Sequence, residues 1–265
     1  MHNFDFVKPS SIAEAAKLLG QDGAQPLSGG QTLMPTMKQR LAAPSVLVSL
    51  TGIDEMKGVC MGDGGLHIGA ATAHAVVAKD AAKHYPALAA LAGGIGDPAV
   101  RSRGTIGGSI ANNDPSACYP AGVLGSGATV VTNKRKIAAD DYFQGMFTTA
   151  LEPGELVVKI AFPLPKAAAY AKFPHPASGY AMAGVFIAQT VSGVRVAVTG
   201  AGASGVFRWT EAEAALAKNL TAAALEKLAV SADDLNEDIH GSREYRAQLV
   251  KVMAGRAAAA ISGKK

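Results

Sequence analysis

Cysteine is scarce in this sequence, and no metal-binding motif is present. Only Cys60 and Cys118 occur among the 265 residues, without a CxxC pair and without the Cys/His spacing of a zinc or iron–sulfur site. The chain therefore cannot ligate a metal cluster by itself, and we expect no metal site in it. So few thiols also favour a reducing compartment.

Long apolar runs and clustered positive charge are missing as well. The N-terminal sequence MHNFDFVKPSS lacks the basic and apolar regions of a signal peptide, and no apolar run is long enough to span a bilayer. The formal net charge is +4, but the Lys and Arg residues are scattered and form no stripe that could track phosphates. We therefore expect a cytoplasmic protein with no transmembrane segment and no nucleic-acid partner.

Composition and apolar patterning indicate a globular α+β protein. Hydrophobic residues make up 49% of the chain and charged residues 17%. The segment 163–169 contains two prolines and an alanine run, and we expect a domain boundary there. The expected helices lie at 11–19, 33–41, 72–92 (in two pieces), 210–217, 221–230 and 242–261, and the expected strands at 46–50, 66–71, 128–132, 155–162, 180–191 and 194–199.

The segment 93–120 differs from the rest of the chain. It is dense in Gly, Asn, Asp and Pro (GGIGDPAVRSRGTIGGSIANNDPSACYP), a composition that predicts a loop. Long connections without secondary structure are uncommon, and those that are ordered usually carry function. We therefore expect a functional loop here.

A first glycine-rich loop, 28–32 (SGGQT), follows a short apolar segment and precedes a helix-like one. Paired glycines let backbone N–H groups approach a phosphate because no Cβ interferes. Ser28, Gln31 and Thr32 add side-chain donors, and a helix start just beyond favours negative charge. An ordinary tight turn is the alternative interpretation of this loop taken alone.

A second loop, 104–109 (GTIGGS), has the same chemistry. Arg101 and Arg103 lie just upstream and could offset the charge of a diphosphate. The alternative is again a turn, with two solvated arginines. Two such loops in one chain fit a long, diphosphate-bridged cofactor held from two sides, and neither has the Gly-Lys-Ser/Thr ending of a P-loop.

A third glycine cluster, 200–205 (GAGASG), matches the GxGxxG pattern and follows a predicted strand. A dinucleotide-binding fold needs several further strand–helix units downstream, whereas about sixty residues of mostly helical pattern remain. We therefore expect a turn packed close to another backbone.

Three segments of the sequence resemble one protein family closely. LSGGQTLMPTMKQRLAAPSVLVSL (27–50), IGDPAVRSRGTIGGSIANNDPSACYPA (95–121) and EPGELVVKIAFP (152–163) resemble the FAD-binding medium subunit of molybdenum hydroxylases, the family of carbon monoxide dehydrogenase and xanthine dehydrogenase. The resemblance covers nearly the whole chain and weakens after Ala203. It implies a two-lobed FAD-binding domain of the vanillyl-alcohol-oxidase (PCMH) type over 1–166, with lobes of about 1–54 and 55–166. A smaller domain of the carbon monoxide dehydrogenase flavoprotein type, with a short antiparallel sheet and helices, would follow at 167–265.

The resemblance also implies which residues bind FAD. The backbone of the two loops would hold the diphosphate, Asp114 would lie near the adenosine half, and Val157 would pack against the flavin. Lys172 and Tyr180 are looser matches for residues beside the isoalloxazine ring, with a solvated lysine and a strand tyrosine as the alternative. The implied set is Leu27, Ser28, Gly29, Gly30, Gln31, Thr32, Leu33, Ile95, Gly96, Gly104, Thr105, Ile106, Gly107, Gly108, Ser109, Asp114, Cys118, Val157, Lys172 and Tyr180.

Cys118 departs from the family pattern. Relatives commonly carry an acidic residue in a DPxxDxPA motif, where this chain has DPSACYPA. A carboxylate there could accept hydrogen bonds from ribose hydroxyls, whereas a thiol is a poor acceptor. We expect a remodelled adenosine-side contact or a small buried residue. We do not expect a nucleophile, because no histidine is placed by sequence to activate the thiol.

The resemblance implies that this chain is an electron-transfer subunit. A partner small subunit with [2Fe–2S] clusters would pass electrons to FAD, and FAD would pass them to an external acceptor. Substrate would react at a molybdenum cofactor in a large molybdopterin subunit, within a dimer of heterotrimers. The cofactor carries the chemistry, so no catalytic residue is expected in this chain. A stand-alone flavin oxidoreductase and a flavin-free scaffold subunit remain the alternatives, and the sequence names neither substrate nor acceptor.

Overall fold

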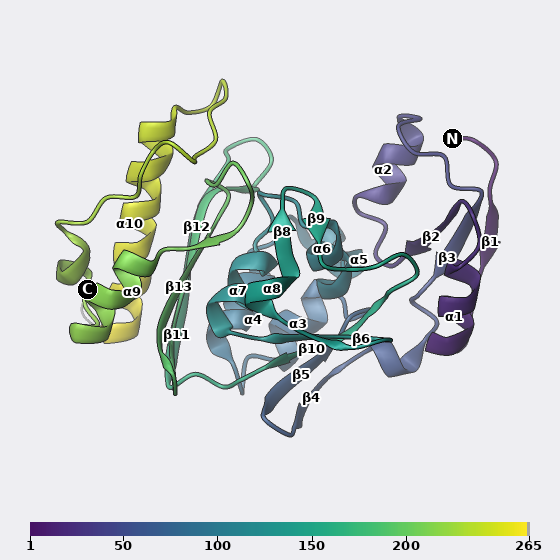
Figure 1. Cartoon of the computed structure of the whole chain (residues 1–265), viewed down its shortest axis with the longest axis horizontal. Coiled ribbons are helices and arrows are strands. Elements are labelled where there is room, and N and C mark those ends of the chain that lie inside the picture. The colour runs from purple at the N-terminus through teal and green to yellow at the C-terminus, as the bar shows by residue number, and fades with distance from the viewer. Residues whose placement is uncertain (264–265) are drawn as a thin grey trace.

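Three sheets lie in a row along the molecule. The computed structural model describes residues 1–263. The N-terminal sheet is at one end, a five-stranded sheet with its helices is in the middle, and a four-stranded sheet backed by the C-terminal helix is at the other end (Figure 1). Within these residues, no helix has both the length and the apolar character needed to cross a membrane.

The N-terminal part combines a parallel three-stranded sheet with two helices. Ser11 begins the first helix as predicted, because its Oγ accepts a hydrogen bond of 3.2 Å from the backbone N–H of Glu14. The second helix ends three residues earlier than expected, and Arg40 beyond it has a φ of 62°, outside the helical region. The strand order is β1-β3-β2. The elements are β1 (Asp5–Val7), α1 (Ile12–Leu19), β2 (Ala24–Leu27), α2 (Leu33–Lys38) and β3 (Val46–Ser49).

The central part is an antiparallel sheet of order β4-β5-β10-β6-β7 with a small β8-β9 ribbon beside it. Strands β5, β6 and β10 follow the predicted positions closely, whereas β4, β7, β8 and β9 are too short or too polar to be predicted from periodicity. The elements are η1 (Asp54–Met56), β4 (Val59–Gly62), β5 (Gly65–Gly69), β6 (Thr129–Thr132), β7 (Lys136–Ala138), α8 (Ala139–Tyr142), β8 (Phe143–Gly145), β9 (Thr148–Thr149) and β10 (Val157–Phe162).

Five helices lie between β5 and β6 in the chain, and they correct one prediction. The segment 93–120, expected to be a loop, contains two short helices and the start of a third. Asp97 and Thr105 cap α5 and α6 through side-chain hydrogen bonds to the N–H groups of Val100 and Gly108. These caps, together with packing, outweigh the low helix propensity of glycine. The helices are α3 (His74–Asp80), α4 (Pro86–Gly93), α5 (Pro98–Arg103), α6 (Ile106–Asn112) and α7 (Tyr119–Ser126).

The C-terminal part is an antiparallel sheet of order β11-β12-β13-β14 between two groups of helices. Helices α4 and α7 contact one side of it, and α9 and α10 contact the other (Figure 1). Strand β11 begins inside the segment expected to be a linker, and the helix expected at 221–230 is only a short 3₁₀ turn. The elements are β11 (Ala167–Pro174), β12 (Ala181–Thr190), β13 (Gly193–Thr199), β14 (Phe207–Arg208), α9 (Thr210–Lys218), η2 (Ala222–Leu225) and α10 (Arg243–Ser262).

The GAGASG cluster is a turn, as predicted. It follows β13 and leads into the short strand β14, not into a helix. A Cβ on Gly200 would come within 2.9 Å of the carbonyl carbon of Ala181, so the backbones approach too closely for a side chain.

The end of β13 fastens the C-terminal sheet to the central part. Thr199 is fully buried, and its single O–H lies within hydrogen-bond distance of two carbonyls, those of Pro115 (3.0 Å) and Ala117 (2.6 Å). The N–H of Gly200 donates to Pro115 as well, at 2.8 Å. The segment between α6 and α7 is therefore fixed by the C-terminal sheet.

Candidate functional site

A cavity of about 660 Å³ opens between the glycine loops, the α6–α7 segment and the β11–β12 hairpin. This volume is in the range of small-molecule and cofactor sites. The structure brings nineteen of the twenty predicted residues to its walls. The exception, Ile106, is fully buried in the hydrophobic core beneath the second loop.

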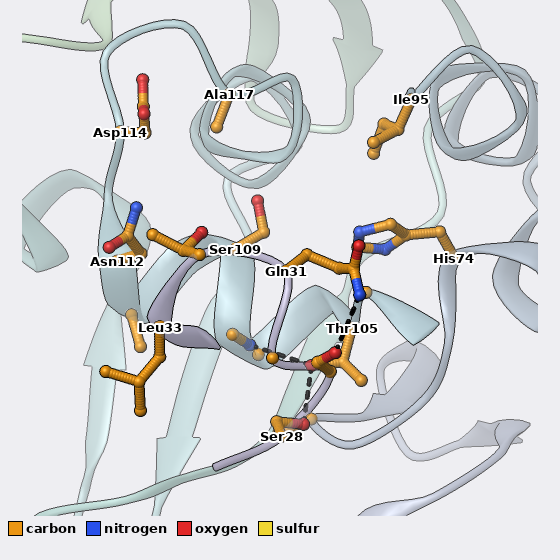
Figure 2. A pocket seen from close by; sticks show the side chains of 18 of the residues that line it. Ser28, Gln31, Leu33, His74, Ile95, Thr105, Ser109, Asn112, Asp114 and Ala117 are labelled. Atoms are coloured by element: carbon orange, nitrogen blue, oxygen red, sulfur yellow. Dashed lines mark hydrogen bonds between the residues drawn. The ribbon is translucent and has the colours of Figure 1, made fainter. Parts of the chain in front are cut away.

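The two glycine loops touch each other. The hydroxyl groups of Ser28 and Thr105 are joined by a hydrogen bond of 2.8 Å (Figure 2). A Cβ on Gly29 would lie 2.6 Å from the Cα of Gly104, so only glycine allows this approach. Two segments more than seventy residues apart therefore form one continuous wall of the cavity.

The first loop keeps its backbone donors available. Within residues 1–263, the N–H groups of Gly29, Gly30, Gln31 and Thr32 donate to no other protein group. Gly30 has a φ of 70°, a conformation that glycine adopts without strain. Its carbonyl accepts the N–H of Met34, which starts the turn into α2. Free N–H groups at a helix start are a typical arrangement for binding a phosphate.

The second loop differs, because most of its backbone donors are already used. The N–H groups of Ile106 and Gly107 donate to the carbonyls of Thr72 (3.2 Å) and Ala70 (2.9 Å). The N–H of Gly108 donates to Oγ1 of Thr105 at 3.2 Å. Gly108 is nevertheless exposed toward the cavity, as is part of Ser109. This loop thus offers an open glycine face and a hydroxyl group.

Arg101 and Arg103 do not line this cavity. The guanidinium of Arg101 donates hydrogen bonds to the carbonyls of Ile95 (3.0 Å) and Gly96 (2.8 Å). The expectation that these arginines offset the charge of a diphosphate therefore has no support in the geometry. Arg101 instead fixes the cavity wall at Ile95 and Gly96.

One end of the cavity lies against the C-terminal sheet. Lys172 lines it and donates hydrogen bonds to the carbonyls of Gly94 (2.6 Å) and Gly179 (3.0 Å). Tyr180 is 54% exposed and lines the same cavity. Burial, and then the charge of Asp114, raises the pKa of the Tyr180 phenol, and Asp114 lines the same cavity.

Cys118 is a buried thiol in the cavity wall, 5% exposed. Burial raises the pKa of the thiol, and the nearby charge of Lys172 offsets this only in part. The thiol is therefore protonated at neutral pH, and thiolate chemistry is not expected of it. This agrees with the interpretation of Cys118 as a small buried residue.

Val157 and Glu155 form the wall beneath the loops. Val157, at the start of β10, is buried and lines the cavity. Glu155 pairs with Arg135 at 3.1 Å and accepts hydrogen bonds from Thr132 (2.7 Å) and the N–H of Glu152 (2.9 Å). Burial alone would raise the pKa of Glu155, but these partners outweigh it and lower the pKa to about 2.

Sequence reasoning missed several residues of the cavity. Glu155 lies inside the EPGELVVKIAFP segment, two residues before Val157, and this proximity could have predicted that it lines the cavity. No sequence signal distinguished His74, which is buried at the start of α3 and points into the region between Gln31 and Ser109 (Figure 2). The further lining residues are Gln25, Pro26, Thr36, Ala42, Leu50, Met56, Ala70, Val100, Ala111, Asn112, Ser116, Ala117, Leu151, Leu156, Ser178 and Gly179.

These features fit a dinucleotide cofactor. The first loop supplies free N–H donors, the face of Gly108 is open where a Cβ would intrude, and Ser28 and Ser109 supply hydroxyl groups. Apolar walls on either side, including Leu33 and Ile95, suit the aromatic ends of such a molecule.

Comparison with known proteins identifies the family. Residues 2–165 match the model of the FAD binding domain in molybdopterin dehydrogenase. The carbon monoxide dehydrogenase medium chain of Afipia carboxidovorans is 36% identical over 96% of this chain and 95% of its own length. The glyceraldehyde dehydrogenase medium chain of Sulfolobus acidocaldarius is 33% identical, with 96% of each chain covered.

Solved structures agree with the sequence relatives. Reconstituted carbon monoxide dehydrogenase from Oligotropha carboxidovorans contains a chain that matches with a TM-score of 0.89 at 32% identity, covering 100% of this chain and 99% of that one. A chain of quinoline 2-oxidoreductase from Pseudomonas putida 86 matches with a TM-score of 0.88 at 27% identity, covering 99% and 98%. The chain therefore belongs to the FAD-binding medium subunits of the molybdenum hydroxylase family and is the FAD-binding component of such an oxidoreductase.

Proposed function

We propose that this chain is the FAD-carrying electron-transfer subunit of a heterotrimeric molybdenum hydroxylase. It takes electrons from [2Fe–2S] clusters of a small partner subunit and passes them to an external acceptor. The observation that carries the proposal is the single cavity built from two touching glycine loops, one of which keeps its N–H groups free. Bound FAD supplies the electron relay, since a flavin exchanges electrons singly or in pairs.

The protein's own residues bind and orient the cofactor. The N–H groups of the first loop, the open face of Gly108 and the hydroxyl of Ser109 hold the diphosphate. Val157 supplies an apolar wall for the ring system, and Tyr180 a half-exposed aromatic one. Because no bond to an organic substrate is made or broken here, no general base in this chain is needed.

We assign residues 1–166 to a two-lobed FAD-binding domain of the PCMH type, with lobes of about 1–54 and 55–166. Residues 167–265 are then the C-terminal domain of the carbon monoxide dehydrogenase flavoprotein type. Support comes from the sheets, since β1 to β10 precede Pro163 and the separate sheet β11-β14 follows it. The contacts of Lys172 and Thr199 mean that this second domain completes the cavity.

The partners follow from the family. A molybdopterin large subunit carries the substrate reaction, and a small subunit carries the iron–sulfur clusters, in a cytoplasmic dimer of heterotrimers. The relatives named above are medium chains of dehydrogenases named for different substrates, which supports a choice of substrate made outside this subunit.

The cofactor part of this proposal is tested on the purified full-length chain. Its visible spectrum should be that of a flavin, and denaturation should release FAD in an amount near one per chain, identified by chromatography. A colourless protein that takes up no FAD on reconstitution would contradict it.

The partner part is tested on the complex from the native cells. A tag on this chain should co-purify two further chains, with iron and molybdenum present in fixed proportion to flavin. A flavin-containing chain that elutes alone and free of both metals would overturn the heterotrimer.

A further inference from the structure

His74 is a buried polar residue in the cavity wall without an assigned role. It is 5% exposed and is the first residue of α3. Its backbone N–H donates to the carbonyl of Gly104 at 2.9 Å, which ties it to the second glycine loop. Figure 2 shows its ring directed toward the Gln31 side chain, on the far side of the cavity from Asp114.

The imidazole of His74 has unused hydrogen-bonding capacity. Its Nδ1 is buried without a partner, and among residues 1–263 no group forms a hydrogen bond with either ring nitrogen. A neutral imidazole carries one donor and one acceptor. Buried polar side chains normally have partners, so an unpartnered one at a cavity wall points to a missing ligand.

The ring is held in place by its neighbours. A Cβ on Gly104 would lie 2.6 Å from Nε2, so the nitrogen-bearing edge rests against that glycine. Gly104 in turn touches Gly29 of the first loop. On its other side, the ring of Tyr119 has its centroid 5.2 Å away. His74 therefore stands behind the point where the two loops meet.

The charge state of this histidine is also defined. Burial, and then the charge of Arg101, lowers the pKa of His74 to about 4. The ring is neutral at physiological pH. The neutral ring can donate or accept a hydrogen bond with a ligand, but it has no extra proton to give up as a general acid at that pH.

We propose that His74 is a cofactor-binding residue whose neutral imidazole forms a hydrogen bond with the FAD held between the two glycine loops. This inference rests on the proposed function, because it specifies a contact within the same site. It assigns to α3 a part in binding that neither glycine motif supplies.

The contact is tested directly by nitrogen NMR of the wild-type full-length chain. With ¹⁵N-labelled histidine, the two ring-nitrogen shifts of His74 are compared in the FAD-free and FAD-loaded protein, after assignment through His74→Gln. We expect one of them to move toward the hydrogen-bonded range when FAD is added, whereas those of exposed His84 stay unchanged. Unmoved His74 shifts in a protein that has bound FAD would overturn the inference.

Variants provide the second readout. His74→Leu should weaken FAD binding about tenfold, the value of one hydrogen bond. His74→Gln, which keeps a donor and an acceptor on a side chain of similar reach, should recover most of the loss. The dissociation constant is measured by flavin fluorescence, alongside the thermal unfolding of each FAD-free variant. Equal losses in both variants, accompanied by equal destabilisation, would make His74 a packing residue only.

The two proposals fail in distinguishable ways. If the wild-type chain binds no FAD, the proposed function fails. If it binds FAD while His74 is silent in the NMR comparison, only the role of His74 fails.

Discussion

The ammonium group of Lys172 donates a hydrogen bond of 2.6 Å to the backbone carbonyl of Gly94, across the junction between the C-terminal sheet and the end of α4. A second bond of 3.0 Å reaches the carbonyl of Gly179 in the β11–β12 loop. One side chain thus holds two walls of the cavity in place. Hydrogen bonds from a charged donor are roughly twice as strong as neutral ones.

Replacing Lys172 should therefore weaken cofactor binding. In Lys172→Met both hydrogen bonds and the positive charge are lost while most of the side-chain volume is kept. We expect the dissociation constant for FAD to rise at least about tenfold, since hydrogen bonds to charged groups contribute roughly 1.5–3 kcal/mol. Fluorescence titration of the FAD-free chain measures it. Lys166→Met, at an exposed lysine, is the matched control, and equal affinities for the two variants would refute the prediction.

The thiol of Cys118 lines the cavity near the charge of this lysine. Cys118→Asp should lower the reduction potential of bound FAD, because a negative charge at the cavity opposes the addition of electrons. Cys118→Ser keeps the site neutral and should leave the potential close to that of the wild type. Spectroelectrochemical titration compares the three proteins. An unchanged potential in Cys118→Asp would mean that this position does not face the flavin half of the cofactor.

Glu155 makes the fold sensitive to acid. Its pKa is lowered from 4.5 to about 2 in the folded chain. A group whose pKa falls on folding adds stability above its unfolded pKa, and this stability is lost as the pH drops toward the folded value. The contribution of Glu155 should therefore be complete above about pH 5 and disappear between about pH 4.5 and 2.

The variant Glu155→Gln isolates this effect. It should be less stable than the wild type at pH 7, because Arg135 loses its charged partner, and the difference should shrink as the pH falls below 4.5. Urea unfolding at a series of pH values measures both proteins. A difference that stays constant from pH 7 to pH 3 would show that the carboxylate is not ionised in the fold.

Much of the fold was predictable from the sequence because its signals are local. Ser11 and Glu14 mark the start of α1, and the Ser192-Gly193 pair marks the β12–β13 hairpin. The failures have a common cause. In the segment 93–120, helix formation depends on caps such as Asp97 and on packing against distant elements, which glycine-rich composition conceals.

The parts of the candidate site that short sequence motifs encode were predictable. The contacts that form only when distant segments fold together were not. The glycine motifs predicted both loops, but not that the hydroxyl groups of Ser28 and Thr105 are hydrogen-bonded to each other or that most N–H groups of the second loop are used internally. His74 joins the cavity only through the pairing of Ala73 with Thr105, a long-range contact that no local pattern encodes. The arginines upstream of the second loop were misinterpreted for another reason, since the guanidinium of Arg101 is taken up by the nearby carbonyls of Ile95 and Gly96.

Gly107 and Gly108, adjacent in the second loop, should differ in how much stability the same substitution costs. A Cβ on Gly107 would lie 2.7 Å from the carbonyl oxygen of Ala70 and 2.9 Å from its Cα, so Gly107→Ala must displace α6. Overpacking of this kind costs about 1–3 kcal/mol. A Cβ on Gly108 would meet only Oγ1 of Thr105 at 3.1 Å and, at 3.9 Å, Cβ of Ser28.

Gly108→Ala should therefore lose much less stability than Gly107→Ala, because only Oγ1 of Thr105 must shift, by a few tenths of an ångström, and the higher helix propensity of alanine offsets this by about 1 kcal/mol. Its methyl group nevertheless projects into the cavity where we place the diphosphate, and FAD binding should fall sharply. Urea unfolding of the FAD-free proteins and fluorescence titration with FAD separate the two effects. Gly107→Ala should lose stability and binding together, whereas Gly108→Ala should lose mainly binding. A Gly108→Ala protein that binds FAD as tightly as the wild type would show that the diphosphate does not lie against this loop.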